Sequence, residues 1–193
     1  MIKLTRQELW RSLRALTLLD MILAPKDGRH HPVMDASCKD GQNRFVLDSS
    51  SGRLWVIFTD DAVVIRGCGR SSEDTEDPSA LLFKDMPEGL LTLFDEAQRR
   101  ETTFCMWQTE GVWHQNKTES DGGEAELMGY IFTSADRMQA WAEEHYAGKL
   151  DDKIMKKLFD KAMLTADEMK ALSPECRPRE VMAEFFSRTV SGR

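Results

Sequence analysis

Two runs of β-branched and aromatic residues dominate the hydrophobic pattern, residues 54–59 and residues 62–68, with Asp60-Asp61 between them. Runs of this composition around a two-residue polar break predict two paired strands joined by a tight turn. Both runs are almost continuously apolar, so they predict a hairpin in the middle of a sheet that is covered on each face. Trp55 would then face Arg66 across the turn, where the two side chains can form a cation–π pair.

Shorter apolar runs predict the rest of the sheet. The predicted strands outside the central hairpin are residues 44–48, 102–109, 112–116 and 127–133. Glu110-Gly111 provides the turn of a second hairpin, because a glycine at the second turn position suits a type I′ or type II geometry. Residues 26–42 contain glycine and proline but no sustained periodicity, so we predict a loop there.

Helical patterns occupy both ends of the chain. A capping box of Thr5 and Glu8 opens a helix that runs to about Leu23, with one wide apolar stripe. Three arginines are predicted to face away from that stripe: Arg6, Arg11 and Arg14. The predicted C-terminal helices are residues 134–146, 151–163 and 165–172, and a last one that follows Pro178.

Clustered strands and segregated helices are the pattern of an α+β protein. We predict a single α+β domain over residues 1–193, with a central antiparallel sheet of about six strands, an N-terminal helix packed on it and a C-terminal helical layer. Residues 1–148 would hold the helix and the sheet core, and residues 149–193 the C-terminal helical part. A chain of this length buries roughly 70% of its unfolded surface, which suffices for a core without disulfides or metals.

The net charge of −7 narrows the choice of partners. It argues against nucleic acid, because phosphate binding needs concentrated Lys and Arg, and it suits either a basic protein partner or simple solubility. The apolar stretch at residues 13–24 is interrupted by Arg14 and Asp20 and is too short to span a bilayer, so no membrane partner is expected. Four scattered cysteines without a C-x-x-C pattern are typical of a reduced, cytoplasmic protein.

Acidic residues gather in three of the predicted turns and loops. The sets are Asp60 and Asp61, then Glu73, Asp74, Glu76 and Asp77, and finally Glu119, Asp121, Glu124 and Glu126. If two of these loops met at one end of the sheet, they would form an acidic rim that docks a basic partner with fast, salt-sensitive association. Trp113, near the tip of the second hairpin, would add a binding hot spot if it were exposed. The alternative is that these loops carry charged residues only because they are exposed to solvent.

Candidate chemistry is limited to two sets of residues. Cys105 and His114 would lie diagonally on one side of the second hairpin, and a Cys–His pair can give a thiolate nucleophile. Core packing of Cys105 is the stronger alternative, because no glycine-rich turn lies beside it. His30, His31 and Cys38 are metal-type ligands, but adjacent histidines do not easily reach one ion, and solvated loop histidines are the simpler interpretation. No nucleotide or hydrolase motif occurs, and no cofactor is expected.

The order of segments adds a resemblance. LWVIF at 54–58, VIRG at 64–67 and TFCMW at 103–107 are followed by WAEEHY at 141–146 and LSPE at 172–175. This layout resembles a family of uncharacterised, small, acidic bacterial cytosolic proteins, and the resemblance implies no reaction. Proteins of this kind are similar in character to the immunity proteins of bacterial toxin systems. The sequence therefore favours a non-enzymatic cytosolic protein that binds a basic partner through its acidic loops, as an immunity or regulatory factor. The alternative is an enzyme with a Cys–His or metal-dependent site.

Overall fold

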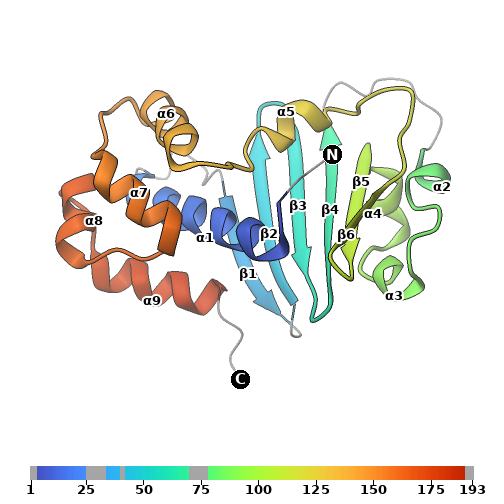
Figure 1. Cartoon of the computed structure of the whole chain (residues 1–193), viewed down its shortest axis with the longest axis horizontal. Helices are drawn as coiled ribbons and strands as arrows, with labels where there is room; N and C mark the ends of the chain where they lie inside the picture. The colour runs from blue at the N-terminus through green and yellow to red at the C-terminus, as the bar shows by residue number, and fades with distance from the viewer. Residues whose placement is uncertain (1–3, 25–33, 40–41, 70–77, 190–193) are drawn as a thin grey trace. The chain divides into compact units, whose positions relative to one another are not determined.

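The computed structural model describes residues 4–24, 34–39, 42–69 and 78–189. In this part of the chain the strands form one six-stranded antiparallel sheet in the order β1-β2-β3-β4-β5-β6 (Figure 1). The strands are β1 (Met34–Lys39), β2 (Gln42–Ser49), β3 (Gly52–Phe58), β4 (Ala62–Gly69), β5 (Phe104–Thr109) and β6 (Val112–Gln115). The helices are α1 (Arg6–Leu23), α2 (Ser79–Leu82), α3 (Glu88–Leu91), α4 (Glu96–Arg100), α5 (Glu124–Met128), α6 (Ala135–His145), α7 (Asp152–Lys161), α8 (Ala166–Leu172) and α9 (Pro178–Thr189).

The predicted α+β class is confirmed, with one helix before the sheet and several after it. The capping box of α1 is present: the Thr5 side chain accepts a hydrogen bond from the backbone N–H of Glu8, and the Glu8 carboxylate accepts one from the backbone N–H of Thr5. A second capping box, of Thr165 and Glu168, opens α8. These local signals fixed the starts of both helices because each satisfies backbone donors that the helix itself leaves unpaired.

One predicted strand is wrong, and another strand lies where a loop was predicted. Residues 127–133 contain the end of α5, followed by turns and bends, and α5 begins after Gly123, which has a left-handed φ of 82°. The remaining strand of the sheet is β1. Met34 and Ala36 are buried while the residues that alternate with them are exposed, which is the period of a strand with one face in a core. The glycines and prolines that flank this short stretch hid its alternation.

Contacts divide the chain into two compact units. The sheet unit consists of the described residues within 40–130, and the helical unit of those within 4–39 and 131–193. The β1 strand belongs to the helical unit because it packs against α1 and α9. The sequence-based division at residue 148 groups the chain differently, since α6 packs on α7 and belongs with the later helices.

The predicted central hairpin is present in the sheet unit. β3 and β4 pair in antiparallel register, with Trp55 opposite Arg66 and Phe58 opposite Val63. Residues 62–67 of β4 are all buried, as expected for a strand with both faces covered. Within this unit, α5 packs against β3 and β4.

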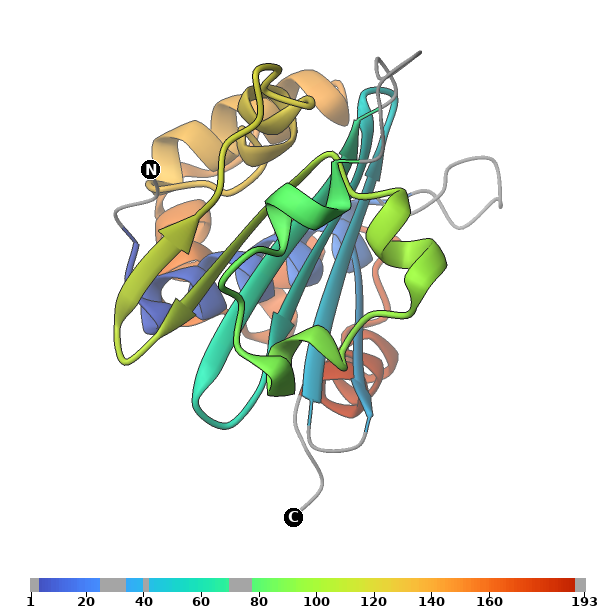
Figure 2. The same cartoon turned by 90° about the vertical axis from the view of Figure 1, so that its right-hand side faces the viewer.

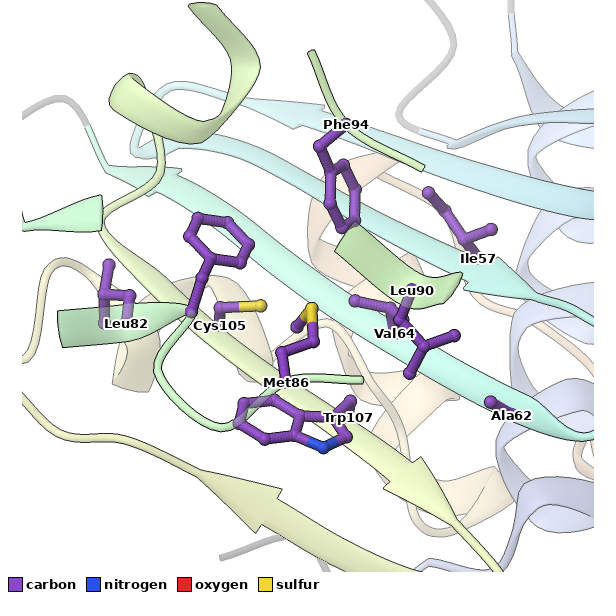
Figure 3. Close-up of a cluster of buried hydrophobic side chains, with 10 residues drawn as sticks. Ile57, Ala62, Val64, Leu82, Met86, Leu90, Phe94, Cys105 and Trp107 are labelled. Atoms are coloured by element: carbon purple, nitrogen blue, oxygen red, sulfur yellow. The ribbon is translucent and has the colours of Figure 1, made fainter. Parts of the chain in front are cut away.

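The segment that carries α2, α3 and α4 lies over one face of the sheet unit (Figure 2). Its side chains form a buried apolar cluster with residues of β3, β4 and β5 (Figure 3). From the segment come Leu82, Phe83, Met86, Leu90 and Phe94, and from the strands Ile57, Ala62, Val64, Cys105 and Trp107. Full burial of one large side chain of this kind contributes about 1.5–3 kcal/mol, so the cluster stabilises the position of a segment with little regular structure of its own.

Arg66 is a charged residue on this buried face, and its side chain is 2% exposed. Its guanidinium carbon lies 3.8 Å from the centroid of the Trp55 ring, which confirms the predicted cation–π pair. The Nη1 group donates to the carbonyl oxygen of Gln98 at 2.6 Å and to Oγ1 of Thr102 at 3.2 Å. These acceptors lie at the C-terminal end of α4, where carbonyl oxygens lack helical partners. Arg66 therefore ties the end of α4 to the sheet.

The helical unit is built around α1. Residues 15–20 of this helix are all buried, so its middle is enclosed rather than amphipathic. It packs against α7, α8, α9 and β1. Polar side chains within it have partners: Ser12 donates to the carbonyl oxygen of Phe132, and Asp20 accepts hydrogen bonds from the Tyr146 hydroxyl and the Met34 backbone N–H. Among the described residues, no helix has the combined length and hydropathy to cross a membrane.

A glycine in β4 provides a test of this packing. A Cβ atom on Gly67 would lie 2.0 Å from Cε1 of Phe104, so Gly67→Ala is expected to lower the free energy of unfolding by about 1–3 kcal/mol. Gly89→Ala in α3 is the control, because nothing lies within 4 Å of its added Cβ and the change should be neutral or slightly stabilising. Urea unfolding of both variants measures the difference. Equal unfolding free energies would contradict the close approach of Phe104 to β4.

Candidate functional site

A pocket of about 260 Å³ lies in the sheet unit beside the loop between β6 and α5. We call it the acidic pocket, and the residues that define it here are Leu82, Phe104, Lys117, Glu119, Asp121 and Glu124. Leu82 and Phe104 are almost completely buried and provide an apolar floor, whereas Glu119 and Asp121 are exposed. Three carboxylates against one ammonium make the polar part of the lining predominantly negative.

The loop that forms the acidic pocket is fastened to the sheet by Thr103. Its hydroxyl accepts a hydrogen bond from the backbone N–H of Gly69 at 3.0 Å and donates to the carbonyl oxygen of Gly122 at 2.6 Å. Gly122 has φ of +58°, and an added Cβ would lie 2.4 Å from the Thr103 carbonyl oxygen, so only glycine fits there. The end of the loop is therefore held against the ends of β4 and β5.

Side-chain hydrogen bonds hold the other parts of this loop. The amide nitrogen of Asn116 donates to the carbonyl oxygens of Leu82 and Lys84, which links the loop to the α2 segment. Gln115 donates to the Glu124 carboxylate, and Asp121 accepts a hydrogen bond from the Gly123 backbone N–H at 3.0 Å. These contacts hold the Asp121 and Glu124 carboxylates in place, which limits the conformational entropy lost on binding.

The acidic residues predicted from the sequence do not all come together. Glu119, Asp121 and Glu124 line the acidic pocket, whereas Glu126 is not part of its lining and accepts a hydrogen bond from the Ser51 hydroxyl. Asp60 and Asp61 are exposed in the β3–β4 turn, at the opposite end of these strands from α5 (Figure 1). The structure therefore does not join the turn and the β6–α5 loop into one rim. The third predicted set, Glu73, Asp74, Glu76 and Asp77, lies outside the described residues.

The tryptophan predicted as a hot spot is only partly exposed. Trp113 lies on β6 opposite Gln108 and is half-buried, whereas its neighbour Val112 is 56% exposed. The acidic pocket adds residues that the sequence analysis did not select, above all its floor. Leu82 and Phe104 come from different parts of the chain, and no periodicity in the sequence indicates that they meet.

The Cys105–His114 pair does not form a nucleophilic site. Cys105 is 0% exposed and lies in the cluster beneath α2, α3 and α4 (Figure 3). His114 is exposed and stacks on the ring of Trp107, with the ring centroids 5.7 Å apart. No hydrogen bond joins Cys105 to His114 among the described residues. Burial raises the pKa of the Cys105 thiol to about 12, although the nearby charge of Arg66 opposes this shift. Burial therefore disfavours the thiolate that nucleophilic attack needs.

The predicted metal ligands are only partly described. His30 and His31 lie outside the described residues, and Cys38 is half-buried near the end of β1. Asp35, on the same strand, forms an ion pair with Arg188 of α9. Within the described ranges, no group of three or more His, Cys, Asp or Glu side chains is arranged to hold a metal ion.

Comparisons of the chain with protein-family models, with curated proteins and with solved structures give no match. The resemblance in segment order therefore assigns no role to any residue.

Burial predicts a clear difference in reactivity between two thiols on neighbouring strands. In folded protein at mildly alkaline pH, an alkylating reagent should modify half-buried Cys68 and leave Cys105 unmodified. In denaturant both should react at similar rates, because the pKa of Cys105 then returns to its ordinary value. Peptide mass spectrometry after timed labelling measures both sites. Alkylation of Cys105 in the folded protein at the rate of Cys68 would revive the Cys–His alternative.

Proposed function

We propose that this protein is a non-enzymatic binding protein that recognises a basic segment of another protein through the acidic pocket. The observation that carries the proposal is the combination in one pocket of an apolar floor, Leu82 and Phe104, with three carboxylates around it. A lysine or arginine side chain has matching parts, because its methylene stem packs on apolar surface while its charged head meets carboxylates. In the cell, such a protein would serve as an immunity or regulatory factor.

The pocket size and the anchoring of its loop support this assignment. A volume of about 260 Å³ accommodates a single long side chain rather than a cofactor. The hydrogen bonds of Thr103 and Asn116 hold the loop in place, so a partner does not have to order it. An exposed acidic lining also accelerates the encounter with a basic partner at low ionic strength.

We place this function in the cytoplasm. The support is the cysteine usage: Cys68 and Cys105 carry free thiols on neighbouring strands of the sheet. Thiols in such positions are typical of proteins from reducing compartments.

The proposal predicts that charge at the acidic pocket, rather than total charge, determines binding. Fluorescence anisotropy with a labelled oligoarginine peptide measures the dissociation constant for wild type and for the double variant Glu119→Gln/Asp121→Asn. We expect the variant to bind roughly 2- to 30-fold more weakly, since each exposed ion pair contributes about 0.2–1 kcal/mol. High salt should weaken binding by wild type more than by the variant.

The matched control is Asp60→Asn/Asp61→Asn, which removes the same charge from the opposite end of the strands. Its dissociation constant should equal that of wild type. If both double variants weaken binding equally, the peptide senses only net charge and the acidic pocket is not the site. An oligoglutamate peptide of the same length should not bind this pocket. A pull-down from source cells with wild type and with the pocket variant then identifies partners whose binding depends on the acidic pocket.

A further inference from the structure

Two arginines of α1 have surroundings that differ from those of the other arginines in the described structure. Arg11 and Arg14 are one turn apart and half-buried. The guanidinium carbon of Arg14 lies 4.9 Å from the centroid of the Phe185 ring of α9, and that of Arg11 lies 6.0 Å from the Phe159 ring of α7. Both α7 and α9 pack against α1 within the helical unit. The sequence pattern predicts only that these side chains face away from the apolar stripe of α1; in the structure each lies near an aromatic ring of a neighbouring helix.

One hydrogen-bonding group of each of these arginines, the Nε–H, is not satisfied by the described part of the protein. In each side chain the Nε atom is buried and has no hydrogen-bond partner in the described part of the chain. No carboxylate there forms an ion pair with either guanidinium. Glu8 is near enough to Arg11 to feel its charge, but the Glu8 carboxylate already accepts hydrogen bonds from Thr5 in the capping box. Burial lowers the pKa of Arg14 from its ordinary value, and no neighbouring carboxylate compensates for that burial.

Other guanidiniums in the chain show that such groups are normally given acceptors. Arg66 is more deeply buried and also stacks on an aromatic ring, yet it donates to Gln98 and Thr102. In the helical unit Arg188 pairs with Asp35 and Glu184. A buried donor without an acceptor destabilises a protein, and a desolvated cation without a counter-charge does so more strongly. The pair on α1 therefore has unused capacity for an acceptor from outside the chain.

We infer that Arg11 and Arg14 form a binding site for an oxyanion, a carboxylate or a phosphate, carried by a ligand with an apolar group. Two guanidiniums offer several N–H donors to the oxygens of one anion, in the geometry that makes arginine the common ligand of carboxylates and phosphates. Stacking on Phe159 and Phe185 restricts both guanidiniums, which reduces the entropy lost on binding. This site differs from the acidic pocket in three ways: its residues come from another part of the sequence, it belongs to the helical unit and its charge is positive.

The apolar part of the ligand is inferred from the aromatic rings around the pair. Trp10 lies 5.8 Å from the guanidinium carbon of Arg14. Phe186, beside Phe185 with ring centroids 5.7 Å apart, is 40% exposed. An oxyanion attached to an aromatic or aliphatic group can pair with the arginines and cover part of this exposed ring, whereas a free inorganic ion can use only the first contact.

The test measures binding to the full chain by isothermal titration calorimetry with two probes, phenyl phosphate and phenylacetate, and with sodium chloride at equal ionic strength. We expect saturable binding of at least one probe, and the tighter of the two identifies the oxyanion. The double variant Arg11→Gln/Arg14→Gln should weaken that binding by about tenfold or more, which is the scale of losing charge-assisted hydrogen bonds. Inorganic phosphate should bind more weakly than phenyl phosphate because it lacks the apolar group.

The matched control is Arg179→Gln, which removes one positive charge from an exposed position of α9. Binding by this variant should stay within about twofold of wild type, since a distant exposed charge is screened. Absence of saturable binding by both probes would overturn the inference, as would equal weakening by Arg179→Gln and by the double variant Arg11→Gln/Arg14→Gln.

A second variant separates a binding role from a packing role. Arg14→Met keeps an unbranched stem against Phe185 but removes the unpaired charge. If Arg14 is retained for binding, this variant should unfold at an unchanged or higher urea concentration than wild type and should fail to bind the probe. A lower unfolding midpoint together with unchanged probe binding would show that the guanidinium serves packing alone, and the proposal would fail.

Discussion

The contact between Arg66, Trp55 and the end of α4 organises the sheet unit. A guanidinium that is 2% exposed lies on the Trp55 ring and donates to the last turn of a five-residue helix. So short a helix is not stable alone, because nucleating it fixes several residues for few hydrogen bonds. The buried cation supplies a partner for the helix carbonyls, and α4 supplies the acceptors that the cation needs. The buried guanidinium without its acceptors and the short helix α4 without its donor would each be unfavourable.

This contact also determines where chemistry is possible. With α4 held at its end, the α2–α4 segment covers the face that carries Cys105, so the thiol is sealed from solvent and its pKa is raised. The same segment places Leu82 beneath the β6–α5 loop, where it becomes the floor of the acidic pocket. Cys105 on the covered face is thus buried, and Leu82 at the edge of the covering segment lines the acidic pocket. Structure and proposed function follow from one placement of the segment.

Sequence reasoning succeeded where a short stretch carries its own structural signal. The central hairpin, the Trp55–Arg66 pair and the capping boxes all depend on residues that are neighbours in the chain or across one tight turn. Sequence reasoning failed where the structure of a segment depends on residues that are distant in the sequence. β1 is a strand because it packs against α1 and α9, and Leu82 meets the pocket loop through tertiary packing. The orientation of Arg11 and Arg14 depends likewise on α7 and α9, which no pattern within α1 indicates.

The net charge of the chain likewise does not reveal the surroundings of its individual charged residues. A net charge of −7 suggested a basic partner, but it gives no sign of two half-buried arginines whose Nε atoms have no hydrogen-bond partner in the described part of the chain. An exposed carboxylate contributes little to stability, because water solvates it well, so the many acidic residues of the surface constrain function only where a pocket gathers them. A partly desolvated guanidinium without an acceptor is different, because the fold is less stable for containing it. Arg66 and Arg188 find acceptors within the chain, whereas the buried Nε atoms of Arg11 and Arg14 have no partner in its described part, and the proposed oxyanion would supply one.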